Sequence, residues 1–291
     1  MVGRMPAIFS VQHGYVPRQA LGKADAMNSG ENYFGKLRAA STTRDSLLCI
    51  GFDPEPRVLG VGIQAAVDFC RNVIDTTSDV ACCYKPNSAF WEQYGPSGWE
   101  ALATVRGFVP PDIPVLLDCK RADVPNTMAA YASAVFDAME FDAATVHAYH
   151  GADSIAMFSE YATRGVYVVC HTSNLGRVDL QHLQCDDQPL FIAVAELAMR
   201  CNGNGNVGVV MGATAPREVA LVRERFPKQP FLLPGVGRQG GDVEATVRAA
   251  FTGDPASCLV AVAGAIMYAD DPRAAALLWR DRLRAAAEAR R

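Results

Sequence analysis

The chain has 291 residues, half of them hydrophobic, and a formal net charge of −4. This length suits one large domain or two small ones, and the hydrophobic content supplies a sizeable core. The weak net charge gives no sign of a nucleic-acid or acidic-membrane partner, and no apolar stretch is long enough to span a bilayer.

Residues 1–26 differ from the rest of the chain. They carry Met1, Met5, scattered glycines and prolines and few acids, without a clear period. A disordered extension, or a true start at Met27, is favoured over a targeting peptide. We therefore expect an N-terminal extension without regular structure over 1–26 and a single domain over 27–291.

From Leu47 onward, a short apolar run, a turn and a segment with helical spacing recur. Runs that are apolar throughout and alternate with helices are typical of a parallel sheet covered by helices. A short helix over 33–40 could close the bottom, and 272–290 has the composition of a terminal helix. The eight predicted strands are 47–53, 80–87, 115–120, 143–149, 166–172, 207–213, 230–236 and 258–265. Predicted helices between them include 64–77, 125–140, 189–200, 216–226 and 242–251.

Eight such units with no strand left over favour closure into a (β/α)8 TIM barrel. The alternative is an open doubly wound sheet, which normally shows Gly-x-Gly-x-x-Gly after its first strand. None follows Asp53. In barrels of this kind the chemistry lies at the carboxyl ends of the strands and in the loops that follow.

The cysteines give information by their positions. No CxxC pair and no metal-ligand spacing is present among the nine. We expect buried reduced thiols, and hence a reducing cytoplasm. Six lie inside apolar runs, namely Cys49, Cys82, Cys83, Cys119, Cys170 and Cys258.

The third strand carries the densest polar signal. Side chains alternate along a strand, so Asp118 and Lys120 share one face while Cys119 takes the other. Lys85 arrives from the end of the second strand, and Asp123 follows on the loop. A surface salt bridge would explain Asp118 and Lys120 equally well if they stood alone. It is disfavoured because buried charges are costly unless paired, so such a cluster at the end of an apolar strand indicates function.

Histidines raise the possibility of a metal site. His147 and His150 would point to opposite faces of an extended strand, and His171 lies one strand later. No histidine pair on the first strand completes a typical barrel metal site, so structural roles are favoured and no metal is expected. The glycine-rich run 202–206 predicts a turn, since it lacks the lysine and hydroxyl residue of a P-loop.

The strand ends together resemble the orotidine 5′-phosphate decarboxylase family, in particular a bacterial type-2-like subgroup. Asp118-x-Lys120-x-x-Asp123, followed by Pro125-Asn126-Thr127, is the central motif. Supporting segments are Cys49-Ile50-Gly51-Phe52-Asp53-Pro54, Tyr84-Lys85-Pro86-Asn87, Cys170-His171-Thr172-Ser173-Asn174, Gly212-Ala213-Thr214 and Pro234-Gly235-Val236-Gly237-Arg238-Gln239-Gly240-Gly241.

The resemblance implies a cofactor-free decarboxylase of a pyrimidine nucleotide that acts as a homodimer. It implies that Lys120 protonates C6 of the pyrimidine and that Asp118 lies near the substrate carboxylate. Lys85 and Asp123 would complete an array of two lysines and two aspartates. Further implied binding roles fall to Asp53 (ribose), Ser173 (pyrimidine), Thr127 (the partner's site) and Gln239 with Gly240 (phosphate). A fixed ammonium suits this chemistry, because it stabilises the developing charge and supplies the proton.

One position departs from the family pattern. The arginine that grips the phosphate at the end of the eighth strand is replaced by Gly264, and Arg238 is the obvious substitute. The chain could therefore be a paralogue acting on an unphosphorylated or modified nucleoside. It could also be a metal-dependent sugar-phosphate decarboxylase, although those relatives lack the lysine found here at Lys85, or a catalytically silent nucleotide-binding barrel.

Overall fold

The computed structural model describes residues 32–60, 62–236 and 242–289, which form a parallel β-barrel. The order of strands in its sheet is β2-β1-β10-β9-β8-β5-β4-β3. Parallel bridges from Tyr84 to Val115 and from Asn87 to Asp118 bring β2 beside β3 and complete the ring. The predicted TIM barrel and its eight strands are confirmed. The strands are β1 (Leu48–Phe52), β2 (Cys83–Pro86), β3 (Leu116–Arg121), β4 (Ala143–His147), β5 (Gly165–His171), β8 (Val207–Met211), β9 (Phe231–Leu233) and β10 (Cys258–Val262).

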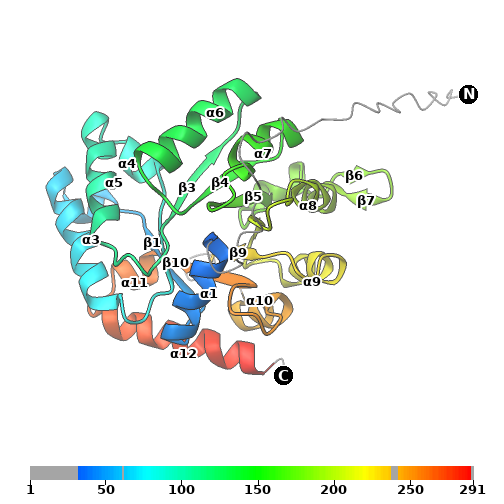
Figure 1. Ribbon diagram of the computed structural model, residues 1–291. Helices are drawn as coiled ribbons and strands as arrows, with labels where there is room; N and C mark the ends of the chain where they lie inside the picture. The colour runs from blue at the N-terminus through cyan, green and yellow to red at the C-terminus, as the bar shows by residue number, and fades with distance from the viewer. Residues whose placement is uncertain (1–31, 61, 237–241, 290–291) are drawn as a thin grey trace, which may run out of the picture.

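Helices surround the strands as a ring (Figure 1). Proline stands in the first turn of several of them, where its fixed φ suits a helix start and its missing N–H costs nothing. The larger helices are α3 (Ile63–Thr77), α5 (Pro96–Phe108), α6 (Pro125–Ser133), α7 (Ala152–Ser159), α8 (Leu190–Arg200), α9 (Pro216–Arg225), α10 (Val243–Ala250) and α12 (Pro272–Glu288). The short ones are α2 (Pro56–Leu59), α4 (Ala89–Glu92) and α11 (Gly264–Met267).

The predicted helices are all present, but one of them changes its geometry and one connection contains structure of its own. The predicted helix 125–140 changes after Ser133 into a π-helical turn, Ala134–Ala138. The connection from β5 to α8, residues 172–189, is longer than a simple turn and is called here the β5–α8 loop. It contains a 3-10 helix (Leu175–Asp179) and a small hairpin of β6 (Gln184–Cys185) and β7 (Gln188–Pro189).

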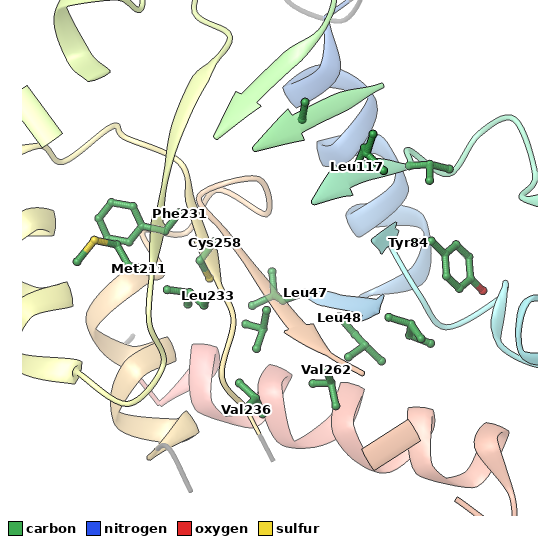
Figure 2. Close-up of a cluster of buried hydrophobic side chains, with 14 of the residues drawn as sticks. Leu47, Leu48, Tyr84, Leu117, Met211, Phe231, Leu233, Val236, Cys258 and Val262 are labelled. Carbon is green, nitrogen blue, oxygen red and sulfur yellow. The ribbon is translucent and has the colours of Figure 1, made fainter. Parts of the chain in front are cut away.

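Alternate residues of each strand enter two separate buried layers, which explains why the strands are apolar throughout. The outer layer lies between barrel and helices, and Figure 2 shows part of it, including Leu48, Tyr84, Leu117 and Val262 from four strands. The inner layer fills the lower barrel and includes Cys49, Cys83, Leu116, Ala143 and Tyr167.

Helix α1 (Tyr33–Arg44) closes the bottom of the barrel, as predicted, although it runs beyond residue 40. Its Tyr33 ring packs edge-on against Tyr167 at 6.0 Å, and its N–H donates to the carbonyl of Thr163 at 3.0 Å, just before β5. Gly165 is required there, because a Cβ would stand 2.3 Å from the Tyr33 ring. The amino ends of the strands are therefore sealed by packed aromatic rings.

Two general expectations concern the state of the cysteines and the absence of a membrane-spanning segment. None of the nine cysteines is in a disulfide, and seven of them are buried, including the six predicted inside strands. Among the described residues, none of the helices combines the length and apolar character needed to cross a membrane. The extension expected over 1–26 lies outside the described residues.

Candidate active site

The site begins where the inner layer of the barrel changes from apolar to polar. Going up the inner face of three neighbouring strands, Cys83 is followed by Lys85, Leu116 by Asp118 and Ala143 by Thr145. The alternation of side chains places these second residues at the carboxyl end of the barrel. A cavity of about 280 Å³ opens there, and its wall includes Gly51, Asp53, Lys85, Asn87, Asp118, Ser173, Gly264 and Tyr268.

Asp118 is the centre of a buried polar network. Lys85 Nζ donates to its Oδ2 at 2.9 Å, while Lys120 Nζ donates to Oδ1 at 2.6 Å. The hydroxyl of Thr145 donates to the same Oδ1 at 2.8 Å and also accepts from the Lys120 N–H at 2.9 Å. One carboxylate is thus held between two ammonium groups. The sequence predicts the convergence of Lys85, Asp118 and Lys120, and the structure brings all three together.

Burial and charge act in opposite directions on this network. Burial alone would raise the pKa of Asp118, but the ammonium groups of Lys85 and Lys120 outweigh it and hold that pKa well below its usual range. Burial likewise opposes the charged form of Lys85, yet Asp118 and then Asp53 outweigh it and raise the pKa of Lys85. Both groups are therefore charged at neutral pH, although Lys85 is only 5% exposed.

Lys120 reaches the network through a break in the regular strand. Its φ is +43°, and the pairing of β3 with β4 shifts register between Leu117 and Arg121. Such bulges re-aim side chains next to active sites, and a positive φ is strained for a residue with a Cβ. Arg121 turns outward over the Tyr131 ring and pairs with Glu92. The Lys120 side chain stays 41% exposed, which leaves its ammonium accessible to a ligand.

Asp53 contributes a buried carboxylate oxygen to the site. Its Oδ1 is buried without a hydrogen bond among the described residues, and burial, opposed by Lys85, raises its pKa. Tyr268, directly after α11, fixes the backbone here: its hydroxyl donates to the Asp53 carbonyl and accepts from the Glu55 N–H, both at 2.8 Å. An oxygen held in this way is suited to accept from a ligand hydroxyl.

Asp123 and Thr127 lie at the same end of the barrel but do not join the network. Asp123 Oδ1 accepts from the Val124 N–H at 2.7 Å, and the Asp123 carbonyl accepts from Ser154. No ion pair links Asp123 to Lys85 or Lys120 within the described part of the chain. Thr127 stands in the first turn of α6, partly exposed. Of the four charged residues predicted to form one array, three meet within a single chain, and Asp123 does not join them.

Ser173 lines the cavity from the start of the β5–α8 loop. Gly212 allows this approach, since a Cβ there would lie 2.8 Å from the Ser173 nitrogen. Gly264 lines another wall, at the start of α11. Arg238, Gln239 and Gly240, predicted to bind phosphate, lie outside the described residues.

The histidines considered as ligands take three different positions. His147 is partly buried at the end of β4, where burial and then Lys120 lower its pKa. His150 is exposed on the following loop, and neither belongs to a cluster of metal-binding side chains among the described residues. His171 is fully buried outside the barrel, against Phe191. The glycine-rich run 202–206 forms the predicted turn between α8 and β8.

Three residues of the site are given no role by the sequence analysis. Thr145 has a signal that could have found it, because it occupies the inner-facing position two residues before His147 on an apolar strand. Asn87 follows Lys85 at the same spacing and lines the cavity. Tyr268 has no local signal, since its role depends on β10, which leads into α11, pairing with β1 from the other end of the sequence.

Known proteins share both the sequence and the fold. The model of the "Orotidine 5'-phosphate decarboxylase / HUMPS family" matches residues 46–278. The chain is 46% identical over 242 residues to the orotidine 5′-phosphate decarboxylase of Thermomicrobium roseum, covering 81% of this chain and 86% of that protein. Among solved structures, Leishmania donovani OMP decarboxylase is similar at a TM-score of 0.82 and 40% identity, covering 88% of this chain and 99% of that one. Leishmania donovani UMP synthase is similar at 0.84 and 42%, covering 88% of this chain and 56% of that one.

Proposed function

The chain belongs to the orotidine 5′-phosphate decarboxylase / HUMPS family, and we propose that it converts orotidine 5′-phosphate to UMP and carbon dioxide without a cofactor. The observation that carries this proposal is the buried Lys85–Asp118–Lys120 network at the carboxyl end of the barrel. The sugar-phosphate decarboxylase relatives lack the lysine found here at Lys85, which favours the nucleotide substrate. A silent binding protein would have no need to keep two lysines around one buried carboxylate.

Lys120 is the proposed proton donor. As the bond between C6 and the carboxylate breaks, its electron pair stays on C6 and carbon dioxide leaves. The Lys120 ammonium, held by Asp118 at 2.6 Å, faces this developing charge, stabilises it and transfers a proton to C6. The neutral amine then regains a proton from solvent. Its partial exposure suits a group that must touch the ligand and be reprotonated.

Asp118 and Lys85 are proposed to fix the electrostatics around the leaving carboxylate. The low pKa of Asp118 keeps it ionised, so that a substrate carboxylate bound beside it meets a negative charge. Lys85 balances that charge and, being buried, holds Asp118 in one orientation with little freedom to relax. The network is therefore organised before the substrate binds, which is the condition for electrostatic catalysis.

The remaining residues are proposed to bind the rest of the nucleotide. Asp53 accepts from ribose hydroxyls through its unpaired buried oxygen, and Ser173 bonds the edge of the pyrimidine. For Arg238 and the neighbouring Gln239 and Gly240, contact with the 5′-phosphate rests on the family resemblance.

A homodimer is proposed to complete each site, with Asp123 and Thr127 reaching into the partner's cavity. Both side chains lie at the barrel mouth, and Asp123 has no ion pair with a described lysine of its own chain. Apolar side chains are exposed on the same face: Tyr149 after β4 is 86% exposed and Val124 after β3 is 54% exposed. Exposed apolar side chains gathered on one face indicate a protein contact. The buried cysteines, none of which is in a disulfide, support the proposal that the enzyme works in the reducing cytoplasm.

The decisive experiment is turnover of orotidine 5′-phosphate by the purified protein, followed by loss of the substrate's ultraviolet absorbance. We expect decarboxylation in the presence of a chelator, because the ammonium of Lys120 supplies both charge and proton. Activity that vanishes in chelator and returns with a divalent ion would instead favour the metal-dependent sugar-phosphate branch of the family. Binding of UMP without turnover would favour a silent barrel.

A second candidate substrate is the unphosphorylated or modified nucleoside. It is favoured by Gly264, which stands with Ala263 and Ala265 in the cavity wall where the family has its phosphate-binding arginine. The ratio of kcat/KM for orotidine 5′-phosphate to that for orotidine separates the two candidates, measured in wild type and Arg238→Ala. A large ratio that collapses in the variant assigns the phosphate contact to Arg238. A ratio near or below one in wild type identifies the nucleoside as the substrate.

A further inference from the structure

Three potential metal ligands meet outside the barrel, away from the decarboxylase cavity. His171, His182 and Glu218 have ligand atoms that all lie within 4.8 Å of one another. They come from three separate elements: the end of β5, the β5–α8 loop and the first turn of α9. None of them lines the cavity that contains Asp118. The proposed decarboxylation therefore gives this cluster no role.

His171 is turned to this position by a bulge. The pairing of β5 with β8 shifts register between Val169 and His171, so that His171 pairs with Met211 of the outer layer. Its ring is fully buried and packs against Phe191 at 5.2 Å. Simple alternation would have placed His171 on the inner face with Val169. A bulge that moves a histidine out of the barrel, toward a second histidine, is a specific arrangement rather than a consequence of strand geometry.

The two imidazole rings already face each other through the atoms that would bind an ion. The Nε2 atoms of His171 and His182 are 2.9 Å apart. Two nitrogens on one tetrahedral zinc ion lie about 3.3 Å apart, given bonds of about 2.0–2.1 Å, so entry of an ion needs only a small separation of the rings. His182 lies on a partly exposed loop that can supply this movement.

The contacts of the buried His171 ring do not fix its tautomer at Nδ1. Burial lowers the pKa of His171 to about 4, Glu218 opposes this effect, and His182 adds a smaller lowering. The Nδ1 atom of His171 is buried without a hydrogen bond among the described residues.

A carboxylate and a guanidinium of the described residues lie near the two rings. Glu218 brings one carboxylate, and no hydrogen bond or ion pair to another described residue occupies it. Arg177 is a cation near His171, and its guanidinium donates to the carbonyls of Ser173 and Asn174, each at 3.2 Å. Two neutral imidazoles and one carboxylate form a ligand set that zinc and similar borderline transition ions prefer over calcium or magnesium.

We propose that His171, His182 and Glu218 bind one divalent transition-metal ion of the zinc class, with water in the remaining position, and that this ion fastens the β5–α8 loop to the barrel. His171 is separated from the cavity residue Ser173 by Thr172 alone, and the side chain next to His182, Gln181, bonds to Thr172 at both ends of its amide. An ion held here restrains the segment that carries Ser173. It takes no part in the transfer of the proton to C6.

The test is metal binding itself, with a readout independent of turnover. Metal-free protein is titrated with zinc by calorimetry, and with Co²⁺ by visible absorption, whose intense bands report tetrahedral nitrogen ligation. We expect one ion per chain in wild type and at least a hundred-fold weaker affinity in His182→Ala, because one of three protein ligands is lost. Glu218→Gln keeps size and shape while removing the charge, and should weaken binding at least ten-fold. His150→Ala, an exposed histidine elsewhere, is the matched control and should bind like wild type.

Binding that is absent from wild type, or that survives unchanged in both His182→Ala and Glu218→Gln, would overturn the proposal. Loss in His150→Ala as well would place the ion elsewhere and overturn it equally. If His182→Ala proves poorly folded by circular dichroism, the isosteric Glu218→Gln decides the question. Turnover of orotidine 5′-phosphate by metal-loaded wild type and by Glu218→Gln, measured in parallel without chelator, tests the decarboxylase proposal separately, since either can fail while the other stands.

Discussion

The two ends of the barrel use the same eight strands for opposite purposes. At the bottom, Tyr33 and Tyr167 fill the inner face with packed rings, and α1 excludes water. Two residues after Cys83 and Leu116, on the same inner faces, Lys85 and Asp118 stand in place of apolar side chains. They form a network of buried charges. The bottom contributes stability through burial, whereas the top retains charges whose desolvation is offset only by their pairing. On β2 and β3, one change of residue type along the inner face thus separates the stabilising end from the reactive end.

The largest effect is expected from removing the ammonium at the top. Lys120→Ala should lower turnover of orotidine 5′-phosphate by at least about a thousand-fold, or roughly 4 kcal/mol of barrier, because it removes charge stabilisation and the proton donor together. Steady-state kinetics measures the loss. Circular dichroism should show an intact fold, since Lys85 and Thr145 still bond to Asp118. A loss within about ten-fold, ~1.4 kcal/mol, would exclude Lys120 as the general acid.

The next largest effect tests whether each active site at the carboxyl end of the barrel is built from residues of two chains. Lys120→Ala and Asp123→Ala should each be inactive alone, yet random mixing of equal amounts should restore about a quarter of wild-type activity. Half of the dimers are then mixed, and each mixed dimer has one intact site. Activity after subunit exchange, with mixed dimers confirmed by mass spectrometry, measures this. No recovery despite confirmed exchange would contradict shared sites and confine the active residues to one chain.

At the bottom of the barrel, we expect a substitution to lower the stability and to leave turnover nearly unchanged. Leu37→Ala empties a fully buried position in α1 and should lower the free energy of unfolding by about 2–5 kcal/mol, as large-to-small core substitutions do. Denaturant unfolding measures this loss. The kcat of the folded fraction should stay within about two-fold, because no residue of α1 lines the cavity. A fall in kcat comparable to that of Lys120→Ala would show that the two ends are not independent.

The smallest effect concerns acid stability. The folded pKa of Asp118 lies below its unfolded value of about 3.9, so the stability from its pairing is fully present above that value and is lost as the pH falls below it. The free energy of unfolding of wild type should thus fall more steeply below about pH 4 than that of Asp118→Asn, by at most ~1.4 kcal/mol per pH unit. Asp254→Asn, at an exposed pair with Arg38, is the control and should alter the slope less. Equal slopes in all three proteins would mean that the pairing does not lower the pKa of Asp118.

Much of the active site followed from the sequence because it lies in strands. A strand buried on both faces must be apolar almost throughout, so a charge at its end is conspicuous, and alternation alone assigned Asp118 and Lys120 to one face. The pairing with Lys85 required only that consecutive strands be neighbours. Lys120 is less regular than simple alternation implies, since a bulge and a positive φ bring its side chain to Asp118.

The sequence by itself determined the eight strands, the barrel and the convergence of Lys85, Asp118 and Lys120, because these depend on burial patterns that repeat locally. Only the tertiary structure decided where His171 points and what it meets. A bulge has no periodic signature, and His182 and Glu218 approach it from a loop and a helix whose packing no local pattern encodes. The same holds for Tyr268, which fixes Asp53 from the opposite end of the chain. Contacts between distant elements depend on the closed barrel as a whole, and therefore become visible only when it has formed.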